Sequence, residues 1–125
     1  MVAFAELCAK SNFSFLEGAS HPEELVSASR ELGQTAIGIA DRDGIYGLVR
    51  AYREVKERGG KLVSGAELTI DYEGISPNGA PSTITVLVQS HTGYRSLCRL
   101  LTRAHDGREK GVARLKLADL AELAI

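Results

Sequence analysis

The pattern of hydrophobic and polar positions along the chain predicts a mixed fold of strands and helices. Short apolar runs predict strands at residues 3–8, 35–41, 61–70 and 83–89. Apolar residues that recur every three or four positions predict amphipathic helices at 19–33, 44–60 and 92–105, and residues 116–125 predict a short helix or turn. The resulting order, β-α-β-α-β-β-α, predicts the α/β class with a mainly parallel sheet.

The first two helices carry detailed expectations. Ser20 is the predicted N-cap of the first helix, Glu23 completes a capping box, and Gly33 ends the helix. In the second helix, the spacing predicts that the apolar side chains face inward, namely Ile45, Leu48, Val49, Tyr52 and Val55. Residues 71–82 hold two prolines and two glycines, which is typical of a surface excursion.

Composition is that of an ordinary globular domain. The chain has 125 residues, of which 44% are hydrophobic and 25% charged, and its formal net charge is −1. A chain of this length can bury one core. No apolar run approaches the ~20 residues of a membrane span, and the start lacks the features of a signal peptide. The two cysteines allow at most one disulfide, so we expect a cytoplasmic protein.

Candidate chemistry lies at the carboxyl ends of the predicted strands, where function collects in α/β folds. The residues there are 8–10, 41–43 and Glu67. Acidic side chains from separate strands could hold a metal ion or act as acid and base. Helix capping and ion pairing with a neighbouring cation explain the same acids, and on chemistry alone this interpretation is favoured.

The other ionisable side chains give weaker signals. His21, His91 and His105 lie in different loops without metal-ligand spacing, so solvated capping roles are expected. Cys98 is expected in the core, whereas Cys8 is the one thiol near the candidate site.

A basic stripe is predicted on the third helix. Arg95, Arg99 and Arg103 share one helical face at i, i+4 spacing. The stripe could contact nucleic acid or an acidic partner. A solvated helix face is favoured, because the net charge is near zero and no aromatic residues are interleaved.

Four segments together carry a resemblance to a known family. "AELCAKSNFSFLEGASHPEELV", "IADRDGIYGLVRA", "LVSGAEL" and "TGYRSLCRLLTRAH" resemble the N-terminal PHP (polymerase and histidinol phosphatase) domain of bacterial C-family DNA polymerases. These are the α subunit of DNA polymerase III and its error-prone relative. "SNFSFLEGASHPEELV" and the "DR" after the second strand favour the error-prone, translesion branch.

The resemblance implies part of a TIM-like barrel with a divalent metal cluster at the carboxyl ends of its strands. In the family, a His-x-His pair, a further acidic or histidine ligand, an Asp-His pair and a glutamate hold the metals. These ligands fall on Cys8, Lys10, Glu17, Asp41, Arg42 and Glu67. Three histidines are therefore lost, and two of their three replacements are cations.

This exchange suggests a site that works without metal. Removing metal ions would leave like charges close together, which is unfavourable. Lys10 and Arg42 can supply the positive charge by pairing with Glu17, Asp41 and Glu67. The resemblance then implies a structural domain with no cofactor and no catalytic residue of its own. The alternatives are a metal-dependent phosphoesterase with an unusual ligand set and a module whose basic helix binds DNA.

The resemblance also implies a larger context. Residues 1–125 would be the N-terminal part of a PHP domain within a longer polymerase chain. That parent protein would catalyse DNA-directed DNA synthesis in replication, repair and translesion synthesis. Its partners would be the rest of the polymerase chain, DNA and other translesion factors. An unpaired edge at the apolar strand 83–89 predicts that the 125-residue piece forms a homo-oligomer.

Overall fold

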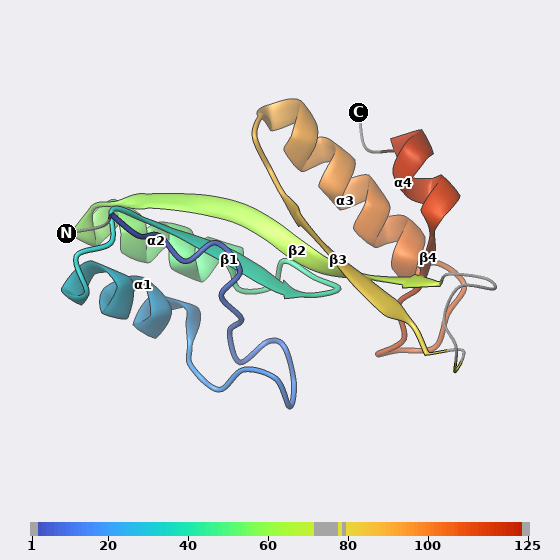
Figure 1. The fold of residues 1–125 in the computed structure, drawn as a ribbon, viewed down its shortest axis with the longest axis horizontal. Coiled ribbons are helices and arrows are strands. Elements are labelled where there is room, and N and C mark those ends of the chain that lie inside the picture. The colour runs from blue at the N-terminus through green and yellow to red at the C-terminus, as the bar shows by residue number, and fades with distance from the viewer. Residues whose placement is uncertain (1–2, 72–77, 79, 124–125) are drawn as a thin grey trace.

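The computed structural model describes residues 3–71, 78 and 80–123 of the chain (Figure 1). Within these residues, helices and strands follow one another along the chain. They are α1 (Pro22–Glu31), β1 (Ala36–Arg42), α2 (Leu48–Arg58), β2 (Lys61–Asp71), β3 (Ser82–Leu87), α3 (His91–His105), β4 (Leu115–Lys116) and α4 (Leu117–Leu123). None of the described helices has the length and apolar character that crossing a bilayer requires.

The sheet is built around the long strand β2. On one edge, β1 pairs with it in parallel, from Ala36 opposite Lys61 to Arg42 opposite Glu67, and β4 continues that edge beside Ile70. On the other edge, β3 pairs with β2 antiparallel. The predicted α/β class with a mostly parallel sheet is therefore confirmed. The described strands do not close into a barrel, so the TIM-like barrel stays a prediction.

Two hydrophobic clusters fill the space between sheet and helices. Figure 1 shows α1 and α2 at one end of the sheet and α3 and α4 at the other. Val26, Ile39 and Ala51 belong to the cluster under α1 and α2, and Leu68 and Leu100 to the cluster under α3 and α4. Ile45 packs against both clusters, so the turn before α2 connects the two halves of the core.

The predicted strand at 3–8 is wrong. The segment runs beside β1, but its only regular ladder contact in the described chain is the parallel bridge between Ala9 and Ile39. The N–H of Gly38 donates to the carbonyl of Glu6 at 2.7 Å, and the N–H of Ala40 donates to the carbonyl of Ala9 at 2.8 Å. Its apolar residues Phe4 and Leu7 are exposed, so no buried face holds a regular strand in place.

Helix α1 begins one residue later than predicted. His21, not Ser20, is the N-cap, and its N–H donates to the carboxylate of Glu24 at 2.7 Å. Pro22 occupies the first turn, where its missing N–H is not needed. Glu23, the predicted capping acid, instead accepts a hydrogen bond from Arg50 at 2.6 Å. The capping signal was therefore correct in kind and displaced by one residue.

The inward face predicted for α2 is correct for three of its five residues. Leu48 is buried, and Ile45 and Val55 pack against the core, whereas Val49 and Tyr52 are exposed. Ala51, which was not among the predicted residues, is fully buried and belongs to the same core cluster as Val26 of α1. Cys98 was also expected in the core and is only half-buried. The predicted excursion at 71–82 lies mostly outside the described residues.

The outer edge of β3 pairs with no other described strand. Thr83, Thr85 and Leu87 are exposed along this strand. Homo-oligomerisation of the 125-residue chain through this edge stays a prediction, which analytical ultracentrifugation over a wide concentration range can check.

Candidate functional site

The first loop of the chain, residues 10–18, is tied together by its own backbone. The N–H of Ser14 donates to the carbonyl of Ser11 at 3.0 Å, and the N–H of Gly18 donates to the carbonyl of Ser14 at 2.9 Å. A Cβ atom at Gly18 would lie 2.3 Å from the carbonyl oxygen of Ser11. Only glycine fits there, so the loop closes tightly before α1.

Asp41 fastens this loop to the carboxyl end of β1. The residue is 1% exposed. Its Oδ1 accepts hydrogen bonds from the N–H of Ser11 and the Oγ of Ser14, and its Oδ2 accepts one from the Oγ of Ser11, each at 2.7 Å. The Oγ of Ser14 also accepts a hydrogen bond from the N–H of Arg42 at 2.9 Å. Neutral donors thus compensate the buried carboxylate.

The expectation that Asp41 pairs with Lys10 or Arg42 is therefore wrong. Both carboxylate oxygens of Asp41 are engaged by donors of the first loop, and its side chain lies in the protein interior. The long cationic side chains reach other acids. Short serine side chains on an adjacent loop can enter a buried space that a hydrated ammonium or guanidinium cannot enter without losing its water.

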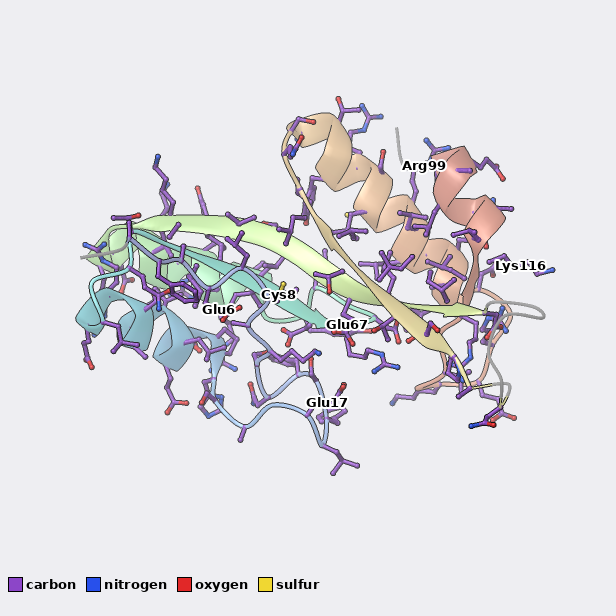
Figure 2. All side chains as sticks on the ribbon, in the orientation of Figure 1. Glu6, Cys8, Glu17, Glu67, Arg99 and Lys116 are labelled. Atoms are coloured by element: carbon purple, nitrogen blue, oxygen red, sulfur yellow. The ribbon has the colours of Figure 1, made fainter. Side chains whose placement is uncertain are left out.

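Beside Asp41 lies a group of charged residues, here termed the ion-pair cluster, made of Lys10, Glu17, Arg42, Asp43 and Glu67. Lys10 Nζ lies 2.6 Å from Glu67 Oε2. Arg42 Nη1 lies 3.3 Å from Glu17 Oε1 and 3.6 Å from Glu67 Oε1. The predicted pairing of these two cations with Glu17 and Glu67 is present. Figure 2 shows Glu67 on the sheet and Glu17 on the first loop below it.

Two members of this site were missed in the sequence-based prediction of ion pairs. Asp43 has a left-handed backbone, with φ of 51°, and its Oδ1 accepts from the N–H of Thr69 at 2.7 Å. The hydroxyl of Thr69 donates to Asp43 Oδ2 at 2.6 Å and accepts from Arg42 Nε at 2.9 Å. The sequence feature that could have identified Asp43 is its position before Gly44, because aspartate tolerates the left-handed conformation found in turns. Thr69 gave no such signal.

The other predicted site residues lie elsewhere or bind differently. Cys8 is exposed, and its N–H donates to Glu6 Oε1 at 2.8 Å. In the basic stripe, Arg103 forms ion pairs with Asp119 at 2.9 Å and Glu122 at 3.7 Å. It therefore docks α4 onto α3, which leaves Arg95 and Arg99 as the part of the stripe available to a partner.

His105 has more than a solvated capping role. It is the last residue of α3, it is half-buried, and its Nε2 lies 2.8 Å from the carbonyl oxygen of Asp43. This contact joins the end of α3 to the turn that follows β1. The side chain therefore connects the ion-pair cluster to the second half of the core.

The donor set of the ion-pair cluster does not fit a divalent metal. Metal ligands must offer a lone pair, and the lysine ammonium and arginine guanidinium offer none. Glu17, Asp43 and Glu67 already face these cations. Within the described residues, no three or more His, Cys, Asp or Glu side chains are grouped so that they could hold an ion. In this arrangement the cations of Lys10 and Arg42 face the three carboxylates directly.

Comparison with known proteins gives a family match over almost the whole chain. Residues 6–124 match the PHP domain. An error-prone DNA polymerase of Anaeromyxobacter sp. (strain K) is 54% identical over 104 residues, which are 83% of this chain and 9% of that protein. The error-prone DNA polymerase of Mycobacterium tuberculosis is 42% identical over 126 residues, which cover 98% of this chain and 12% of that protein. The chain thus spans about a tenth of the length of these relatives.

Two solved structures share the fold. An amidohydrolase of Chromobacterium violaceum, determined with bound sulfate and no metal, superposes with a TM-score of 0.64 at 22% identity, over 83% of this chain and 34% of that one. A presumed metal-dependent phosphoesterase of Bifidobacterium adolescentis superposes with a TM-score of 0.63 at 22% identity, over 80% of this chain and 32% of that one. At this identity, the likeness shows the fold alone.

Proposed function

Because the chain belongs to the PHP domain family, we propose that it is part of the PHP domain of an error-prone DNA polymerase and has a structural role. In this proposal, residues 1–125 form the N-terminal part of that domain. The parent chain carries out DNA synthesis in replication, repair and translesion synthesis in the cytoplasm, with catalytic residues outside this segment. Its partners are the rest of the polymerase chain, DNA and other translesion factors. The similarity to error-prone DNA polymerases from several bacteria supports this assignment.

The observation that carries the structural role is the pairing of Lys10 with Glu67, at 2.6 Å. Lys10 comes from the first loop and Glu67 from β2, and Arg42 at the end of β1 reaches Glu67 as well. The cluster therefore joins three segments next to the carboxyl end of β1. In this proposal, Lys10 and Arg42 replace the positive charge of metal ions, so the segments keep their positions without a cofactor.

Metal analysis tests the proposal directly. Purified chain is equilibrated with ZnCl₂ or MnCl₂, desalted and analysed by mass spectrometry of the metals. We expect well under one ion per chain. The matched variant Lys10→His/Arg42→His, which puts histidine at two of the positions that hold it in the family, is expected to retain more zinc, because imidazole offers a lone pair. One tightly bound ion per unmodified chain, lost in Glu67→Gln, would contradict the proposal.

An activity assay separates the structural role from a phosphoesterase. Bis(p-nitrophenyl) phosphate is incubated with the chain and Mn²⁺ or Zn²⁺, and we expect no release of nitrophenolate above the buffer blank. Without a suitable ligand set, nothing lowers the pKa of a bound water. Metal-dependent turnover that disappears in Glu67→Ala would establish the alternative, an enzyme with an unusual ligand set.

A further inference from the structure

A cleft opens next to the ion-pair cluster, between the first loop and the loop that follows α3. Its volume is about 560 Å³, which lies in the usual range of ligand sites. Figure 1 shows both loops on the lower side of the sheet. The cleft walls combine aromatic rings from one side with cationic side chains from the other. Glu17, Arg42 and Asp43 of the ion-pair cluster also line the cleft, whereas the aromatic rings and the cations of the loop after α3 lie outside that cluster.

The aromatic wall is formed by Phe13, Phe15 and Tyr46. Phe15 is 82% exposed and Tyr46 is 63% exposed. The Tyr46 ring is nevertheless held in place. Its centroid lies 6.3 Å from that of Phe13, and a Cβ atom at Gly44 would lie 2.3 Å from Cε2 of the ring. The glycine backbone thus supports an exposed ring, which presents a flat apolar surface to the cleft.

The opposite wall carries positive charge that the protein does not neutralise. Arg108 and Lys110 line the cleft and are exposed, and neither forms an ion pair with any residue that the structure describes. Arg42, by contrast, is engaged by Glu17 and Glu67. Glu109 also lines the cleft, so its charge is mixed and the two cations are separated along the loop.

We propose that this cleft binds single-stranded DNA, with bases stacked on Phe15 and Tyr46 and phosphates against Arg108 and Lys110. Proteins that bind single strands combine such stacking surfaces with cations along the backbone. A duplex hides the faces of its bases, so exposed rings favour the single strand. The proposed site goes beyond the structural role of the ion-pair cluster, and it requires neither metal nor hydrolysis.

Because the net charge of the chain is −1, we expect little general electrostatic attraction to DNA. Binding of DNA would therefore indicate a local site. A second candidate surface exists on α3, where Arg95 and Arg99 are both exposed. This pair provides a matched control, because replacing both by serine removes as much charge as replacing Arg108 and Lys110. The two double variants therefore differ in the location of the lost charge and not in its amount.

Fluorescence anisotropy of a labelled twelve-residue oligo(dT), titrated with the 125-residue chain at several salt concentrations, tests the proposal. We expect Arg108→Ser/Lys110→Ser to weaken binding about tenfold at low salt, and to lower the slope of log K against log [salt] by about 1.4, since each phosphate contact on a single strand contributes about 0.7. Arg95→Ser/Arg99→Ser should leave affinity within about twofold of the unmodified chain.

The aromatic variants give an independent readout. Phe15→Ala and Tyr46→Ala should each weaken binding about fivefold to a hundredfold, while the salt slope stays unchanged, because stacking releases no counterions. Tyr46→Phe keeps the ring and should keep the affinity. Phe15 is exposed, so its replacement should leave the fold intact, and circular dichroism checks this for every variant.

Three results would overturn the proposal. The first is an absence of saturable binding to oligo(dT) by a folded chain. The second is a larger loss of affinity in Arg95→Ser/Arg99→Ser, which would place the DNA on α3. The third is that a DNA duplex or an oligoglutamate peptide binds as tightly as oligo(dT) and that the aromatic variants have no effect. This result would indicate a site for any polyanion or for an acidic protein. All three are independent of metal content, so this proposal and the structural role can fail separately.

Discussion

Asp41, near the carboxyl end of β1, and Glu67, within the neighbouring strand β2, are compensated in different ways. Asp41 is 1% exposed and accepts three hydrogen bonds from Ser11 and Ser14. The side chain of Glu67 is 16% exposed and faces the cations of Lys10 and Arg42. In the sheet register, Arg42 lies opposite Glu67 and Asp41 lies opposite the residue before it. Two acids on neighbouring strands therefore have different kinds of partner.

The difference shows what each acid contributes to the site. The donors to Asp41 belong to short side chains and backbone of a single loop, so the hydrogen bonds fix the path of that loop. The partners of Glu67 are long side chains with water nearby, so they balance charge and hold geometry less strictly. The end of the sheet thus combines a rigid hydrogen-bonded part with a more adaptable electrostatic part.

The largest expected effect is that of Asp41→Asn. An asparagine amide would face three donors with one remaining acceptor oxygen, so at least one buried donor loses its partner. We expect the free energy of unfolding to fall by about 3 kcal/mol. Urea denaturation measures this, and the loss should be the same at low and high salt. A loss below about 1 kcal/mol would mean that the loop rearranges easily and that the rigid part is not rigid.

Ser14→Ala should have the next largest effect. The Ser14 hydroxyl donates to Asp41 and accepts from the N–H of Arg42, so its removal leaves one buried donor without a partner. We expect the free energy of unfolding to fall by about 1.5 kcal/mol. Ser27→Ala is the control, since its hydroxyl makes a single hydrogen bond of 3.2 Å to Glu54 and its loss should change stability by about 0.5 kcal/mol. Equal effects in the two variants would contradict the special position of Ser14.

Glu67→Gln tests the electrostatic part. It keeps the shape of the side chain and removes the negative charge that Lys10 and Arg42 face. We expect a loss of about 1 kcal/mol at low salt, because the residues are only partly buried. The loss should shrink in 0.5 M NaCl, since salt screens partly exposed charges. Urea denaturation at both salt concentrations measures it, and a loss that does not change with salt would place Glu67 in the same class as Asp41.

The smallest effect is expected for the exposed pair of Glu23 and Arg50. Burial raises the pKa of Glu23, but hydrogen bonds from its own backbone N–H and from Arg50 outweigh it and hold the pKa below the ordinary value of 4.5. A carboxyl group whose pKa is lowered in the folded state stabilises the fold at pH values above its ordinary pKa. This contribution to stability is lost as the pH falls through the folded-state pKa. Glu23→Gln should therefore be less stable than the unmodified chain at pH 7, by less than about 1 kcal/mol, and equal to it at pH 2. Denaturation at both pH values checks this, and a difference that persists at pH 2 would show that the charge is not responsible.

Much of the electrostatic part was predictable from the sequence. The runs at 35–41 and 61–70 predicted β1 and β2 closely, and they placed Asp41 at the end of one strand and Glu67 on the next. The resemblance to the PHP domain of C-family polymerases then placed Lys10 and Glu67 in one site, and their opposite charges predicted the ion pair that the structure contains. The strands depend on local periodicity, which can be read from residue order, whereas the ion pair was predicted because the resemblance brought two remote positions together.

The rigid part and the cleft were decided by the tertiary structure alone. Ser11 and Asp41 are thirty residues apart, and Asp43 and Thr69 are twenty-six apart, so nothing in their local sequence selects them as partners. Tyr52 is exposed because α2 turns the face with Ala51 toward the core. The position of the Tyr46 ring depends on its close contact with Gly44. The sequence by itself determined the elements and the charges of this protein. Its hydrogen-bond partners and exposed rings depend on distances between remote segments, which exist only once the core has packed.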